Sequence, residues 1–133
     1  MQRIDVMFIL LAAFMLVCGV SMGVYMAASH DFQLMPVHAH VNLVGWASLA
    51  LFGLVYRVFP ELGRSRLARI HLLFAGPAAI LLPAGITLVV FTGFPWLAMV
   101  SALLWLAGCL VFLAQVIGLA LGRPSLADPM PAE

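Results

Sequence analysis

The sequence contains no lysine and very few charges of either sign. Only 8% of its 133 residues are charged, 65% are hydrophobic, and the formal net charge is +1. Soluble domains carry about 25% charged residues, so this composition indicates a membrane protein. The lack of a basic surface excludes nucleic acid as a partner and leaves the lipid bilayer as the expected one.

Cysteine is also scarce. The two cysteines, Cys18 and Cys109, each lie in the middle of an apolar stretch. We expect both to be small packing residues, because redox enzymes do not reach that depth easily. No internal repeat is visible, and the length allows one domain no larger than a small helical bundle.

Four apolar stretches are long enough to cross a membrane, which takes about 20 residues for ~30 Å of hydrocarbon. They cover roughly residues 6–28, 40–59, 67–91 and 96–121, and proline, glycine or charged residues separate them. The sequence therefore predicts an all-α fold, a polytopic membrane four-helix bundle occupying residues 1–122. Residues 123–133 are polar and proline-rich, and we expect a disordered cytoplasmic tail there.

Arginine sets the expected orientation. Every arginine lies at the N-terminus, between the second and third stretches, or at the C-terminus, and four crossings place these regions on one side. The positions are Arg3, Arg57, Arg64, Arg66, Arg69 and Arg123. The positive-inside rule makes that side the cytoplasm. We expect a multi-pass protein of the bacterial inner membrane whose other side faces the periplasm.

Metal-binding side chains collect at the expected periplasmic end. Histidine and methionine side chains together suit haem iron or copper. Both residue types also have simpler roles, because methionine fills membrane helices and histidine tolerates the wet interface. The candidates at this level are His30, Asp31, His38, His40 and Asn42, with Met22, Met26 and Met35 close by.

His38 and His40 cannot do the same job if both are helical. Two residues of helix amount to about 200° of rotation, so the two rings face opposite ways. Either one is a ligand and the other supports it, or His38 precedes the helix. Asn42 lies on the His38 side, and a stripe of small and aromatic residues follows, suited to another helix or to a flat macrocycle. The stripe comprises Gly45, Trp46, Leu49, Gly53 and Tyr56.

Two further features have structural interpretations. One is a pair of glycines that favours helix packing, and the other is a histidine that we expect at the membrane interface. Gly19 and Gly23, four residues apart in the first stretch, offer a close helix contact. His71 begins the third stretch near Arg69, at the cytoplasmic level, where we expect an interfacial side chain bonded to a neighbouring loop. A bilayer thickness would separate it from His40, so the two cannot bind one haem within a chain.

The stretch from His38 to Glu61, with its His-x-Asn opening, its tyrosine and its Pro-Glu, resembles the second transmembrane helix of the catalytic subunit of haem-copper oxidases. The C-type oxidases and nitric oxide reductases are the most similar. In that family the histidine before the asparagine is an axial ligand of the low-spin haem b, which would be His40 here. Arg69 to Leu72 resembles a Lys-Ile-His-Phe helix start whose histidine binds no haem, and the His-Ala-His opening also resembles the NnrS family.

The resemblance covers about half of the chain and omits most of the family's ligands. A second low-spin ligand, a histidine for the active-site haem and three copper histidines have no counterparts, and the 4 histidines of this chain cannot supply them. We therefore do not expect the chain alone to reduce oxygen or nitric oxide.

Three functions remain open on these residues. The first is electron transfer through a haem b bound by His40, with Asn42, Trp46 and Met26 near the haem. His38, His30, a methionine or the His40 of a homodimer partner would be the second ligand. The second is copper binding by His40, His38 and His30 for delivery to an oxidase. The third is an accessory subunit of a larger respiratory complex.

Overall fold

The computed structural model describes residues 3–122, and within them every regular element is a helix. The predicted all-α fold is therefore confirmed. The tail predicted at residues 123–133 lies outside the described residues.

Four long helices form the bundle. The first is α1 (Ile4–Ser29). The second is continuous through α2 (Met35–His40), the π-helical segment η1 (Val41–Ser48) and α3 (Leu49–Val58). A short helix, α4 (Pro60–Arg64), then leads to α5 (Arg66–Thr92) and α6 (Trp96–Ala120).

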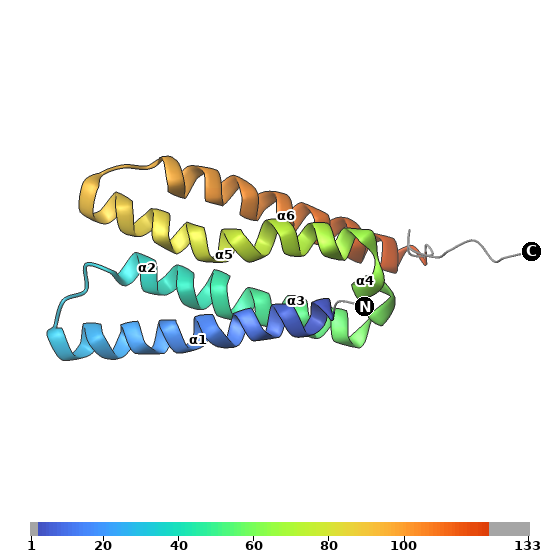
Figure 1. The fold of residues 1–133 in the computed structure, drawn as a ribbon, viewed down its shortest axis with the longest axis horizontal. Coiled ribbons are helices and arrows are strands. Elements are labelled where there is room, and N and C mark those ends of the chain that lie inside the picture. Colours follow the sequence, from blue (N-terminus) through green and yellow to red (C-terminus); the bar gives the residue numbers. More distant parts are fainter. Residues whose placement is uncertain (1–2, 123–133) are drawn as a thin grey trace, which may run out of the picture.

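The long helices pair as two hairpins that lie side by side (Figure 1). The first hairpin packs α1 against η1 and α3, and the second packs α5 against α6. The start of α1, the α3–α4–α5 connection and the end of α6 all lie at one end of the bundle. We call this the arginine end. The loops after α1 and after α5 lie at the opposite end, which we call the histidine end.

Local chemistry explains where the helices stop and start. His30 follows the end of α1 and Gly93 follows the end of α5, and both residues are left-handed, with φ of 53° and 73°. Such residues close helices because they turn the backbone out of the helical path. Ser65 caps the start of α5, and its hydroxyl accepts a 3.0 Å hydrogen bond from the Ala68 amide.

The second span starts earlier than expected. We predicted it from about residue 40, but the helix already begins at Met35 and includes Pro36 near its first position. Proline fits there because its missing N–H would have no helical partner and its φ is preset for a helix. His38 is therefore helical, and the alternative in which it lies in irregular backbone is wrong.

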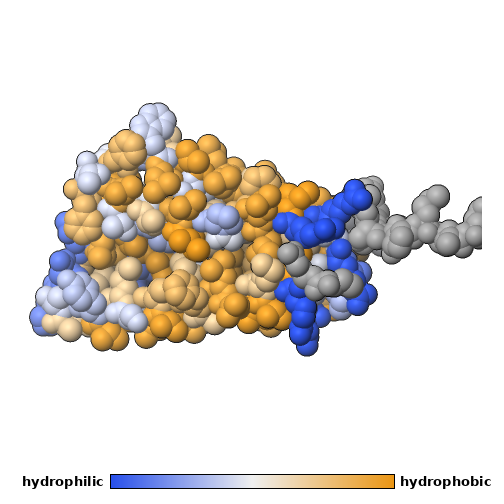
Figure 2. All heavy atoms as spheres, in the orientation of Figure 1, coloured by the Kyte–Doolittle hydropathy of each residue, from blue (hydrophilic) through white to orange (hydrophobic). Residues whose placement is uncertain are grey.

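The outer surface of the bundle is a broad apolar band bounded by polar residues at both ends (Figure 2). All 4 long helices are long and apolar enough to cross a membrane. Leucine, valine and phenylalanine side chains point outward along them, as on a surface that lipid covers. The chain is a multi-pass membrane protein in a lipid bilayer.

Candidate functional site at the histidine end

His38 faces α1. A Cβ added to Gly23 would lie 3.1 Å from His38 Cε1, so the ring rests almost on the α1 backbone. The Asn42 amide donates to the His38 carbonyl oxygen at 2.8 Å and lies 3.4 Å from His38 Nδ1. Asn42 itself covers Gly19 in the same way. The two glycines predicted as a helix contact therefore receive these two polar side chains.

His40 lies two residues further along the same helix, about 200° around its axis from His38. It is half-buried, and its Nδ1 lies 2.8 Å from the carbonyl oxygen of Pro36, one turn earlier. A carbonyl oxygen only accepts, so Nδ1 must donate its hydrogen to it. The neutral ring then carries its free lone pair on Nε2, the form in which histidine binds a metal.

A π-helical segment follows His40 directly. η1 runs from Val41 to Ser48, and the Ser48 hydroxyl donates 2.8 Å to the carbonyl oxygen of Leu43, five residues earlier. π-helical turns are rare and occur frequently at functional sites, because they change which side chains share a face. His40, the candidate ligand, thus lies where the α-helical segment α2 meets the π-helical segment η1.

The other predicted site residues do not converge on His40. Met26 is buried, with 5% of its surface exposed. Met22 packs beside Met15, Val37 and Val41. His30 is exposed in the turn after α1, and Trp46 is 41% exposed on the outer surface.

Within residues 3–122, no three or more His, Cys, Asp or Glu side chains come together in a way that could hold a metal ion. The nitrogen set His40, His38 and His30 is therefore not assembled within this part of the chain. A copper site here would have to draw on other donors, such as methionine or a second copy.

The glycines of the predicted stripe pack against α1. A Cβ on Gly45 would lie 2.5 Å from Met15 Cε, and one on Gly53 would lie 3.0 Å from the Asp5 carbonyl oxygen. Leu49 and Tyr56, on the same side, are 0% and 2% exposed. For these residues helix packing is the role, and a macrocycle has no room on that face.

A second polar cluster lies buried near the arginine end. The Tyr56 hydroxyl lies 2.7 Å from His71 Nδ1 and accepts a 2.8 Å hydrogen bond from Gln115 Nε2. The Ser65 hydroxyl donates to Gln115 Oε1 at 3.2 Å. Since the Gln115 amide donates to Tyr56, the tyrosine is free to donate to His71. One connected network thus joins the second, third and fourth spans.

Aromatic rings enclose His71. The ring centroids of Phe52, Phe8 and Phe112 lie 4.6, 4.9 and 5.3 Å from that of the histidine. His71 is 0% exposed, and its Nε2 is the one buried side-chain N or O atom without a hydrogen-bond partner in residues 3–122. Phe52 meets the ring edge-on at 74°, a geometry in which aromatic pairs attract.

The prediction that His71 is an interfacial side chain bonded to a loop is wrong. His71 is buried inside the bundle, where it contacts the Tyr56 hydroxyl of α3 and two phenylalanine rings pack against it. From the sequence we expected Tyr56 only in the packing stripe, and we predicted no role for Gln115. A glutamine within an apolar span was the signal that could have indicated this network, since buried amides need partners.

Comparisons of the chain with protein-family models, with curated proteins and with solved structures found no match.

Proposed function

We propose that the chain binds haem b at the histidine end through His40 and serves in membrane electron transfer. The observation that carries this proposal is the 2.8 Å contact between His40 Nδ1 and the Pro36 carbonyl oxygen, which leaves Nε2 as the metal-binding nitrogen. Metal-bound histidines almost always make such a bond with their other nitrogen.

The surroundings of His40 suit a flat apolar group. The ring is half-buried at the end of the apolar band, where the next turn exposes Leu43 and Trp46. Haem b supplies reversible one-electron transfer when bound. In this arrangement the helix holds the imidazole in one tautomer and one direction, and the apolar side chains nearby exclude water.

In this proposal a second copy of the chain would supply the second residue that holds the haem. His38 rests on Gly23 of α1, and Met26 is buried. Two-fold symmetry would present the same residue, His40, from both chains to one haem. This arrangement needs one haem for two chains.

The proposed orientation puts the arginine end in the cytoplasm and the histidine end in the periplasm of a bacterial inner membrane. Arg3, Arg57, Arg64, Arg66 and Arg69 all belong to the arginine end, and the loops at the histidine end contain no arginine. Electrons would then enter or leave near the outer surface. Reduction of oxygen or nitric oxide by the chain itself is not part of the proposal.

Haem titration of the detergent-purified protein tests the proposal. We expect added haem to give the sharp Soret band of a six-coordinate low-spin b-type haem. His40→Ala should abolish that band, while His30→Ala, which changes an exposed histidine at the same end, should leave it intact. A protein that stays colourless with added haem, or equal spectra for wild type and His40→Ala, would overturn the proposal.

Copper binding and an accessory role in a respiratory complex are the alternatives. If the protein handles copper, metal analysis would find copper in the wild type. The His38→Ala variant and the His40→Ala variant would each have lost it. An accessory subunit would copurify with a larger complex and show no spectroscopic change in either variant. The geometry of His40 favours haem, because a single oriented imidazole per chain suits axial ligation better than a copper site lacking further nitrogen ligands.

A further inference from the structure

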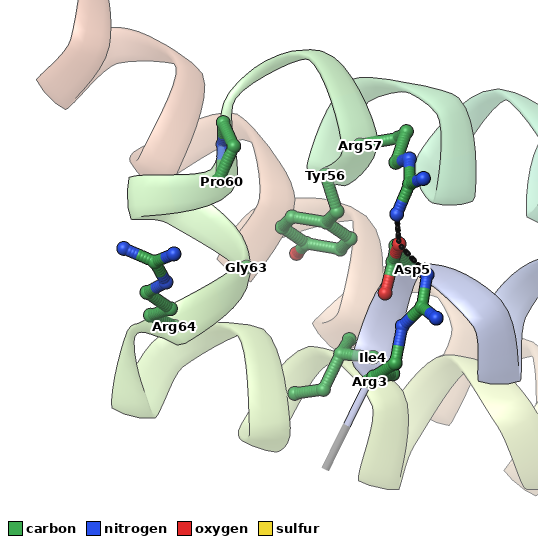
Figure 3. A pocket seen from close by; sticks show the side chains of 8 residues that line it. All are labelled: Arg3, Ile4, Asp5, Tyr56, Arg57, Pro60, Gly63 and Arg64. Atoms are coloured by element: carbon green, nitrogen blue, oxygen red, sulfur yellow. Dashed lines mark hydrogen bonds and ion pairs between the residues drawn. The ribbon is translucent and has the colours of Figure 1, made fainter. Parts of the chain in front are cut away.

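A cavity of about 330 Å³ opens at the arginine end, far from His40 (Figure 3). Its walls come from the start of α1, the end of α3 and the short helix α4. The lining residues are Arg3, Ile4, Asp5, Tyr56, Arg57, Pro60, Gly63 and Arg64. Small-molecule sites in proteins begin at about this volume. We call this cavity the arginine pocket.

The pocket carries excess positive charge. Three guanidinium groups line it against one carboxylate, that of Asp5. Asp5 Oδ2 lies 3.1 Å from Arg57 and 3.6 Å from Arg3. Figure 3 shows the two arginines reaching Asp5 from different elements, so the carboxylate holds them together.

Arg64 also lines the pocket, and its side chain is exposed. It comes from α4, on the other side of Tyr56 in Figure 3, and it forms no ion pair with any carboxylate in residues 3–122. A guanidinium presents paired N–H donors that match the oxygens of a phosphate group.

The start of α1 forms part of the pocket wall. Arg3 is the N-cap of this 26-residue helix and makes no side-chain capping hydrogen bond, while the Asp5 carboxylate lies in the first turn. Arg3, Ile4 and Asp5 all line the pocket. The excess of guanidinium groups over carboxylates in the lining favours an anion with several oxygens.

We infer that the arginine pocket binds a phosphate group. Its position, at the edge of the apolar band, is the level at which phospholipid headgroups lie (Figure 2). The chemistry is that of a phosphate ester or of phosphate itself, supplied by an anionic phospholipid or by free phosphate. The inference does not depend on haem binding.

Native mass spectrometry of the full chain tests the lipid source. The protein is released from micelles containing equal amounts of phosphatidylglycerol and phosphatidylcholine. We expect wild type to retain phosphatidylglycerol about fivefold more than phosphatidylcholine, the effect of about one interfacial charge pair. Arg64→Gln should reduce this preference toward equality. Arg66→Gln, an exposed arginine at the same end outside the pocket, should keep it.

A second arm tests free phosphate. Inorganic phosphate, compared with chloride at equal ionic strength, should raise the melting temperature of wild type but not of Arg64→Gln if the pocket takes the free ion. A lipid preference without phosphate stabilisation assigns the pocket to headgroups, and the converse assigns it to the free ion. The inference is overturned if neither effect appears, or if Arg64→Gln and Arg66→Gln behave alike.

Discussion

The Tyr56 hydroxyl and His71 Nδ1 lie 2.7 Å apart inside the bundle, where the two residues are 2% and 0% exposed. This contact joins the two hairpins, because Tyr56 belongs to α3 and His71 to α5. Gln115 of α6 adds its amide to the same hydroxyl. One phenolic oxygen therefore connects three of the four spans.

Removing that oxygen should destabilise the bundle. Tyr56→Phe keeps the ring among Phe8 and Phe112 but leaves His71 Nδ1 and the Gln115 amide buried without their partner. We expect a loss of about 1 to 2 kcal/mol in the free energy of unfolding, measured as a lower melting temperature in detergent. Tyr25→Phe is the matched control, since Tyr25 is 60% exposed. Equal melting temperatures for the two variants would refute the structural role of the hydroxyl.

The contact between α5 and α6 should depend on Gly85. A Cβ at this position would overlap the backbone nitrogen of Ala98, which cannot move aside as a flexible side chain would. We expect Gly85→Ala to cost about 1 to 3 kcal/mol through overpacking. Gly118→Ala, in the same hairpin, meets nothing within 4 Å and should be neutral or slightly stabilising. Thermal unfolding of both variants checks the pair, and a neutral Gly85→Ala would contradict the close approach.

Ser65 should matter both as a helix cap and as a partner of Gln115. Its hydroxyl accepts from the Ala68 amide at 3.0 Å and donates to Gln115 Oε1 at 3.2 Å. Ser65→Ala is expected to cost about 1 kcal/mol in unfolding free energy, because the first turn of α5 loses its cap. Ser65→Thr retains a hydroxyl and should recover most of that loss. Equal destabilisation by alanine and threonine would show that the hydroxyl is not the reason.

His38 should be separable from His40. His38→Ala removes a ring that fills the space beside Gly23 and Asn42. The variant should unfold at a lower temperature yet retain the haem spectrum, because His38 is not the ligand in this account. A spectrum lost in His38→Ala while the protein stays folded by circular dichroism would instead make His38 a ligand.

The positions of the four spans could be predicted from the sequence, but the contacts between the spans could not. Hydropathy and breakers placed the helices within a few residues, because membrane insertion depends on local composition. The glycines at positions 19 and 23 correctly indicated a close helix contact. Which side chains would fill it was not predictable, since that depends on the relative rotation of two helices.

The buried network was missed for the same reason. Tyr56 and His71 are separated by 15 positions, and Tyr56 and Gln115 by 59. No local periodicity links them, so only the tertiary arrangement brings them together. The bond from His40 to Pro36 was local, but predicting it required knowing that the helix begins before Pro36.

The haem content of the protein purified from bacterial membranes tests the central claim most directly. The reduced-minus-oxidised spectrum should show a low-spin b-type band, and haem quantification should give one haem for two chains in wild type and none in His40→Ala. A folded wild-type protein that contains no haem and binds none when it is added would contradict the account, as would a His40→Ala protein with the same haem content as wild type.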